Sequence, residues 1–133
     1  MASIFSKIVL GEIPCYKVAE NDEFLAFLDI MPLAEGHTLV IPKKETDYIF
    51  DIEEDAYHRF WDFAKEVALK LKTHIPCKRI GISVIGLEVP HAHIHLIPLQ
   101  QIEDINFSKA KTKAPEQALA TLASILFEDN LIV

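Results

Sequence analysis

Three of the chain's six histidines alternate with apolar residues in the stretch His91-Ala92-His93-Ile94-His95-Leu96. In an extended strand successive side chains point to opposite faces, so the three imidazoles are expected on one face and the apolar residues on the other. A helix would spread the same rings over roughly 400° of turn. The spacing therefore predicts a strand that is anchored to a core on one face and carries reactive groups on the other.

Spacing alone leaves three interpretations of His91, His93 and His95 open. They could form a solvated polar face, or they could bind a metal ion, since histidine is a common metal ligand. Same-face positions on one strand span roughly 13 Å, however, which is too far for one tetrahedral ion to collect all three. The third interpretation is phosphoryl or nucleotidyl transfer, with one neutral imidazole as nucleophile and protonated neighbours as donors to phosphate.

Composition narrows the possible ligands and the compartment. The chain has 133 residues, half of them hydrophobic, and a formal net charge of −7. This charge makes a polymeric nucleic acid an unexpected partner but allows a small nucleotide. Cys15 and Cys77 form no closely spaced pair, which favours free thiols in a reducing compartment. No signal segment or long apolar run is present, so we expect a cytoplasmic protein that does not enter a membrane.

The elements that must position the histidines can be read from apolar periodicity and turn residues. One long helix is expected between an N-terminal cap at Asp51 and a stop at Pro76, and its apolar face is wide enough to meet a second subunit. Two shorter helices are expected at residues 4–9 and from Pro115 onward. Strands are expected at residues 15–19, 23–28, 37–42, 79–85 and 91–98. This pattern predicts an α+β fold on an antiparallel sheet of about five strands, in one domain spanning residues 1–133.

Three blocks of the sequence resemble the histidine-triad (HIT) family. The stretch at residues 91–98 resembles the family's signature of histidines alternating with apolar residues. Residues 4–14 resemble its opening segment, and residues 27–43 its second block. The resemblance covers roughly residues 4–100 and leaves residues 101–133 as a C-terminal segment with a helix. It implies a HIT-like fold and a homodimer that takes purine nucleotides, such as derivatives of AMP or GMP.

The resemblance also implies a mechanism and a role for each histidine. His93 would attack the α-phosphorus of a nucleoside 5′-phosphate derivative, and water would then hydrolyse the covalent nucleotidyl-histidine. His95 would contact the phosphate and help the leaving group, and His91 would hold the network that orients His93. His37 corresponds to a fourth, upstream histidine. No metal or other cofactor is required by this mechanism.

The same resemblance implies a set of nucleotide-binding residues. Asp29 would accept hydrogen bonds from the ribose hydroxyls. The base would lie in an apolar slot, and the connection before the triad would contribute two further residues; these positions are Phe5, Ile8, Leu28, Ile30, Ser83 and Val89. Read without the resemblance, Phe5 and Ile8 could be ordinary core residues and Asp29 a turn carboxylate.

The connection before His91 departs from the family pattern. It is shortened, and Leu87 and Glu88 stand where many members have glutamine and a hydroxyl residue. A leucine cannot donate a hydrogen bond to phosphate, and a carboxylate repels it. The compact chain and its opening block favour the Hint-like branch, which cleaves adenosine phosphoramidates or aminoacyl adenylates. Alternatives are a Fhit-like hydrolase of dinucleoside polyphosphates, a non-catalytic nucleotide-binding regulatory module and, last, a metal-binding protein. We also expect the C-terminal segment to reach a partner subunit's site.

Overall fold

The computed structural model describes residues 2–129. Residue 1 and residues 130–133, which the predicted domain includes, lie outside the described residues. The helices are α1 (Ile4–Val9), α2 (Glu54–His74) and α3 (Glu116–Phe127), with short 3₁₀ turns η1 (Ile49–Asp51) and η2 (Ile102–Ile105). The strands are β1 (Lys17–Glu20), β2 (Phe24–Leu28), β3 (Thr38–Pro42), β4 (Arg79–Ser83) and β5 (Ile94–Leu99). Among the described residues, no helix combines the length and apolar character needed to cross a membrane.

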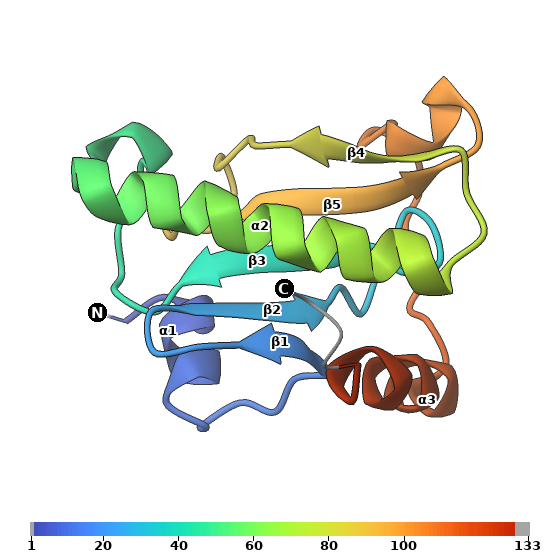
Figure 1. Ribbon diagram of the computed structural model, residues 1–133, viewed down its shortest axis with the longest axis horizontal. Coiled ribbons are helices and arrows are strands. Elements are labelled where there is room, and N and C mark those ends of the chain that lie inside the picture. Colours follow the sequence, from blue (N-terminus) through green and yellow to red (C-terminus); the bar gives the residue numbers. More distant parts are fainter. Residues whose placement is uncertain (1, 130–133) are drawn as a thin grey trace.

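The five strands form one antiparallel sheet in the order β1-β2-β3-β5-β4 (Figure 1). The β1–β2 hairpin closes where the Asn21 side chain accepts hydrogen bonds from the backbone N–H groups of Glu23 and Phe24. The chain then leaves β3 through the long helix α2 and returns along the edge strand β4 before β5 fills the gap beside β3. The predicted α+β fold on a five-stranded antiparallel sheet is confirmed.

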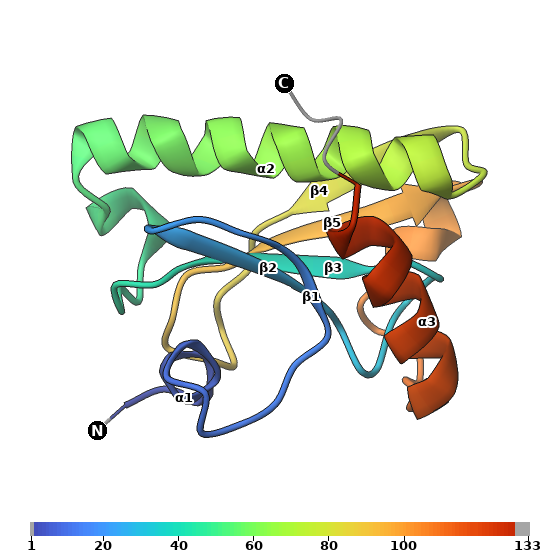
Figure 2. The ribbon, with the colours of Figure 1, turned by 60° about the horizontal axis from the view of Figure 1, so that its bottom comes forward.

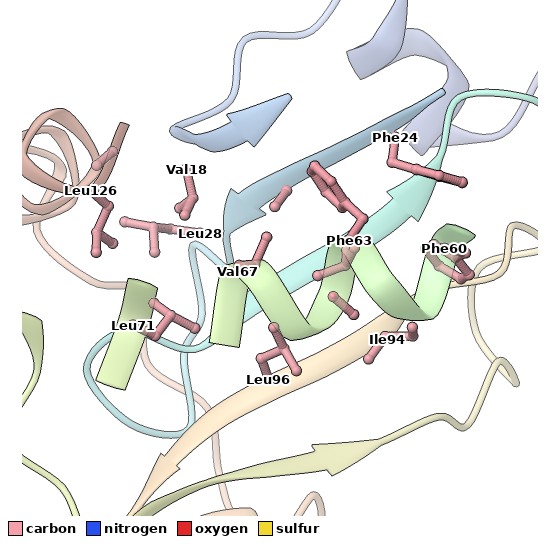
Figure 3. Close-up of a cluster of buried hydrophobic side chains, with 14 of the residues drawn as sticks. Val18, Phe24, Leu28, Phe60, Phe63, Val67, Leu71, Ile94, Leu96 and Leu126 are labelled. Carbon is pink, nitrogen blue, oxygen red and sulfur yellow. The ribbon is translucent and has the colours of Figure 1, made fainter. Parts of the chain in front are cut away.

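Helices cover both faces of the sheet. Figure 2 shows α2 along one face and α1 on the opposite side, with α3 beside the β1–β2 end. The larger core lies between α2, α3 and the sheet, where Phe60, Val67 and Leu71 meet Ile94 and Leu96 (Figure 3). A smaller core lies under α1 and consists of Phe5, Leu25, Phe27, Leu39 and Ile41. Because β2 and β3 are buried on both faces, β2 is apolar throughout and β3 is apolar after Thr38.

The start of α2 differs from the prediction. Asp51 does not cap this helix, because it belongs to the 3₁₀ turn that precedes it. Glu53 is the N-cap instead, and its carboxylate accepts hydrogen bonds from the backbone N–H groups of Asp55 and Ala56. A carboxylate at this end is also favoured by the helix dipole. Acidic side chains at several neighbouring positions made the sequence compatible with more than one cap.

The buried face of α2 gives a test of the core. Leu71 is fully buried, whereas Leu10, just after α1, is 68% exposed. We expect Leu71→Ala to lower the free energy of unfolding by about 2–5 kcal/mol, because it removes buried methylenes and leaves a cavity. Leu10→Ala makes the same chemical change at the surface and should cost less than about 0.5 kcal/mol. Urea denaturation of both variants provides the comparison, and equal losses would contradict this description of the core.

Candidate active site

The predicted alternation of the histidine stretch is confirmed, although regular strand pairing begins only at Ile94. Ala92, Ile94 and Leu96 belong to the core beneath α2. His91 and His93 precede β5 in a stretch held by other hydrogen bonds: the His91 N–H donates to the Val89 carbonyl at 2.8 Å, and the Ala92 N–H donates to the Thr46 carbonyl at 2.7 Å. The first bond closes a tight turn around Pro90, and the second attaches Ala92 to the loop that follows β3.

The histidine stretch and the segment before β3 bring four buried histidines to one region, namely His37, His91, His93 and His95. The rings of His93 and His95 lie 4.9 Å apart, and those of His37 and His95 lie 5.2 Å apart. His37, 58 positions away in sequence from His95, comes close because β3 pairs with β5. The structure therefore assembles all four predicted catalytic histidines.

Main-chain partners fix which nitrogen carries the proton in His91 and His93. His91 Nε2 lies 2.7 Å from the Pro42 carbonyl oxygen, and His93 Nδ1 lies 2.8 Å from the His91 carbonyl oxygen. A carbonyl only accepts, so each of these nitrogens must carry a hydrogen. His91 Nδ1 then accepts from the Ser3 hydroxyl at 2.8 Å. In neutral His93 the remaining nitrogen, Nε2, keeps its lone pair and is able to act as a nucleophile.

The same reasoning orders His37 and His95. The backbone N–H of Leu33 donates to His37 Nδ1 at 3.0 Å, so in the neutral ring the hydrogen of His37 lies on Nε2. That N–H points to His95 Nδ1 at 2.9 Å. His95 therefore accepts through Nδ1 and presents an N–H at Nε2. The relay of hydrogen bonds from Leu33 through His37 to His95 thus fixes the hydrogen of His95 on Nε2, where it is available to a ligand.

Burial keeps three of these histidines neutral at physiological pH. Desolvation lowers the pKa of His37 to about 4 even though the Asp29 carboxylate opposes the shift. Desolvation, with the charges of neighbouring groups, lowers the pKa of His95 to about 3, and burial also lowers the pKa of His91. The expectation that the neighbours of the nucleophile are protonated is therefore wrong. They donate hydrogen bonds as neutral rings, because a buried imidazolium loses its hydration.

Aromatic rings enclose the histidines from both ends. The Phe5 ring, carried by α1, meets His93 edge-on with centroids 5.0 Å apart. At the other end, Phe107 meets His95 edge-on at 4.8 Å. Phe107 was not among the predicted site residues. It is the one aromatic residue at positions 101–115, but the local sequence does not show which distant side chains it contacts. The C-terminal segment, predicted to reach a partner's site, thus contributes a ring to the site of its own chain.

Asp29 lies beside His37, and its two carboxylate oxygens have different surroundings. Its Oδ1 accepts a hydrogen bond from the Met31 N–H at 2.9 Å, which is the local turn role considered above. Its Oδ2 lies 3.7 Å from His37 Nε2, at the margin of the site. The side chain is only partly buried, so an oxygen of this carboxylate can meet a ligand hydroxyl while the other holds the loop.

The remaining predicted contacts divide between the two faces of the sheet. Ile8 and Val89 pack against the cluster under α1, and Ser83 is the register partner of His95 on the adjacent strand β4. Ile30 is exposed beside Asp29. The Leu28 side chain does not belong with them: it is buried in the core beneath α2 and α3. Neighbouring Phe27 points to the histidine face instead, because side chains alternate along β2.

Ser3, Ser6 and Glu45 form a support for His91 that the sequence did not reveal. The Ser6 hydroxyl donates to Glu45 Oε1 at 2.6 Å, and the Ser3 backbone N–H donates to the same oxygen at 2.7 Å. Ser3 also caps α1 by accepting from the Ser6 N–H. The Ser3 side chain therefore connects α1, the helix that carries Phe5, to His91, which lies 88 positions further along the chain.

Asp29, His37 and His95 form the group of three possible metal ligands identified within residues 2–129, with ligand atoms within 4.8 Å of one another. The hydrogen bonds argue against such a role. His37 Nδ1 already receives the Leu33 N–H, so its Nε2 carries a hydrogen and has no lone pair for a metal. A metal would have to break the Leu33–His37–His95 relay. With these hydrogen bonds in place, His37 cannot ligate a metal through Nε2.

Comparison with known proteins agrees with the resemblance found in the sequence. The HIT domain matches residues 10–102 of the chain. Adenosine 5′-monophosphoramidase HNT1 of Saccharomyces cerevisiae is 41% identical over 99 residues, which cover 73% of this chain and 62% of the yeast protein. An uncharacterized HIT-like protein of Borreliella burgdorferi is 37% identical over 113 residues, covering 80% of this chain and 81% of the relative.

Solved structures show the same fold. A crystal structure of a Hit-like protein involved in cell-cycle regulation, from Bartonella henselae, superposes with a TM-score of 0.81 at 29% identity. The match covers 93% of this chain and 92% of that one. The similarity thus extends beyond residue 102 into the C-terminal segment.

The lowered histidine pKa values predict how stability depends on pH. Between about pH 6.5 and 5 the unfolded chain takes up protons on its histidines, whereas native His37 and His95, with pKa values of about 4 and 3, do not. The free energy of unfolding should therefore fall as the pH is lowered through this window, by up to about 1.4 kcal/mol per pH unit for each such histidine.

His95→Asn should reduce this slope, because it removes one of the histidines whose pKa is lowered by burial while retaining an acceptor for His37. His58→Asn provides the control, since His58 is exposed on α2 and its variant should keep the wild-type slope. Urea denaturation at several pH values between 7 and 5 measures the slopes. Identical slopes for His95→Asn and wild type would show that His95 is not held neutral by burial.

Proposed function

This chain belongs to the HIT family, and on that premise we propose that it hydrolyses nucleoside 5′-phosphate derivatives at the α-phosphorus through a covalent nucleotidyl-His93 intermediate. The observation that carries the proposal is the 2.8 Å hydrogen bond from His93 Nδ1–H to the His91 carbonyl oxygen. This bond leaves the Nε2 lone pair available for attack. It also stabilises the positive charge that the ring acquires when Nε2 bonds to phosphorus.

The reaction then has two displacements. In the first, His93 Nε2 forms a bond to the α-phosphorus and the bond from phosphorus to the leaving group breaks. The leaving atom keeps the electron pair of that bond, and an amine leaving group takes its proton from solvent water. In the second, water attacks the same phosphorus and releases a proton to solvent, the phosphorus–Nε2 bond breaks, and neutral His93 is regenerated as the nucleoside monophosphate leaves. Two easier displacements replace one difficult direct attack by water.

His95 acts in this scheme as a hydrogen-bond donor, not as the acid that protonates the leaving group. Its Nδ1 accepts the His37 Nε2–H at 2.9 Å, so its Nε2–H is free to meet a phosphate oxygen or the leaving atom. If His95 gave that proton away, its ring would become anionic. A proton passed from His37 to His95 would only move the negative charge to the His37 ring, which still accepts from the Leu33 N–H. Neither state is favourable for buried neutral rings.

The substrate that we propose is an adenosine phosphoramidate or aminoacyl adenylate, with AMP or GMP derivatives as the purine class. Support comes from the name of the yeast relative, an adenosine 5′-monophosphoramidase. Asp29 would meet the ribose, and Phe5, Ile8 and Ile30 would contact the base. Cys15 and Cys77 are free thiols, which is compatible with the proposed cytoplasmic location.

We also propose that the protein is a homodimer joined along β4. This strand is an edge of the sheet, and Ile82 and Ile85 on and after it are 53% and 45% exposed. Nearby on α2, the Trp61 indole N–H is buried without a hydrogen-bond partner among residues 2–129. A cavity of about 410 Å³ there is lined by Trp61, Val84 and Ile85 and reaches His93. A second copy would cover this apolar edge.

Covalent catalysis by His93 can be tested with adenosine 5′-phosphoramidate in excess EDTA. We expect the wild type to turn over and His93→Ala to lose at least about 10³-fold in kcat/KM, because no other positioned nucleophile replaces Nε2. Acid quenching followed by intact-mass analysis should detect one adenylyl group on the wild type and none on His93→Ala. His58→Ala, on the surface of α2, serves as the matched control and should behave as wild type.

The alternatives make different predictions in the same experiment. Binding of AMP by both proteins without turnover would favour a non-catalytic nucleotide-binding module. Activity that disappears only with the chelator would favour a metal-dependent reaction. Faster turnover of diadenosine polyphosphates than of the phosphoramidate would favour the Fhit-like alternative.

The proposed dimer can be tested by sedimentation. We expect the wild type to sediment at about twice the monomer mass of 15.1 kDa. Ile82→Lys should produce a folded monomer, because a charged side chain at the centre of the apolar edge cannot be buried unpaired. Ile102→Lys replaces an isoleucine that is 87% exposed on η2 and should leave the dimer intact. A wild type that sediments as a monomer at high concentration would contradict the proposal.

A further inference from the structure

The segment between β5 and α3 lies across the histidine site and is attached at both ends. At one end the Phe107 ring contacts His95 edge-on at 4.8 Å and approaches His37 at 6.2 Å. At the other end the Ala114 N–H donates to the Ile30 carbonyl at 2.9 Å, next to Asp29. In Figure 2 this orange segment passes from the end of β5 to α3. Residues 107–114 thus run from His95 toward the residue proposed to bind the ribose.

Lys111 lies in this segment, and its positive charge acts electrostatically on His37 and His95. Its ammonium nitrogen is 5.8 Å from the centroid of the Phe107 ring, on which His95 packs. After the effect of burial, the positive charge of Lys111 is among the influences that lower the pKa of both His37 and His95. Lys111 is itself exposed, and none of the described acidic side chains makes a salt bridge with it.

The site otherwise offers an anionic ligand little positive charge. His37, His91 and His95 are neutral near pH 7 because burial lowers their pKa values. Asp29 brings a carboxylate to the margin of the site. On the opposite side, the connection before His91 carries Leu87 and Glu88, and the leucine side chain is almost wholly exposed. An α-phosphate in this position has hydrogen-bond donors around it but needs a cation to balance its charge.

We propose that Lys111 is a phosphate-binding residue of this site, whose ammonium group contacts the phosphate of a bound nucleotide from the side of His95. The inference rests on the proposed function, since it concerns the ligand of the same site. Phe107 then acts as the anchor that holds the segment against His95. In this arrangement Lys111 holds the phosphate beside His93 without exchanging protons.

Binding of AMP and of adenosine separates this role from a structural one, because the two ligands differ only in the phosphate. Calorimetric titration should show AMP affinity falling about tenfold or more in Lys111→Ala, the usual effect of losing a charge-assisted hydrogen bond. Adenosine affinity should stay within about twofold of wild type. Lys111→Arg should restore most of the AMP affinity. Lys113→Ala removes another exposed cation two positions away and should leave both affinities unchanged.

Each other outcome overturns the proposal. Unchanged AMP affinity in Lys111→Ala, in a wild type that binds AMP, would show that this lysine does not contact phosphate and would leave the proposed function standing. Equal losses for AMP and adenosine would show that Lys111 only maintains the shape of the site. Equal losses of AMP affinity in Lys111→Ala and Lys113→Ala would assign the effect to net charge. A wild type that binds neither ligand would overturn the proposed function together with this inference.

Discussion

The directional hydrogen bonds between main-chain groups and imidazole rings are the constraint on which the rest of the site depends. A carbonyl can only accept and a backbone N–H can only donate, so Pro42, His91 and Leu33 assign the protons of the histidines they contact. A neutral ring has one lone pair and one N–H. Once one nitrogen is committed to the main chain, the chemistry of the other is determined. This leaves a lone pair on His93 beside an N–H on His95.

The sheet provides these main-chain groups at fixed positions. Pairing of β3 with β5 brings His37 to His95 and places the carbonyl at the end of β3 beside His91. On the opposite face, Ile94 and Leu96 pack under α2 and hold the strand against movement. The smaller cluster under α1 then excludes water from the histidine face. Rigid placement and low polarity arise from the same packing, and both are needed for a preorganised site.

Neutral histidines have a consequence for the ligand. Low polarity keeps the nucleophile's neighbours uncharged and strengthens each hydrogen bond they donate. The same low polarity makes an anionic phosphate costly to bind unless a cation stands nearby. In this chain the segment after β5, with Phe107 as its contact to His95, brings Lys111 to that position. The core of the site and its charge balance therefore come from different parts of the sequence.

Periodicity in the sequence determined the five-stranded sheet and the three helices. It also determined the alternation that points the side chains of Ile94 and His95 to opposite faces of the sheet. These features follow from backbone geometry repeated over a few residues. Periodicity could not determine which face Leu28 occupies, since all five residues of β2, from Phe24 to Leu28, are apolar. Nor could it predict the tautomers of His91 and His95 or the place of Phe107. The tautomers and the place of Phe107 depend on contacts between segments that are far apart in the sequence. The contact between Ser3 and His91, 88 positions apart, is an example, and only the tertiary structure decides which segments make such contacts.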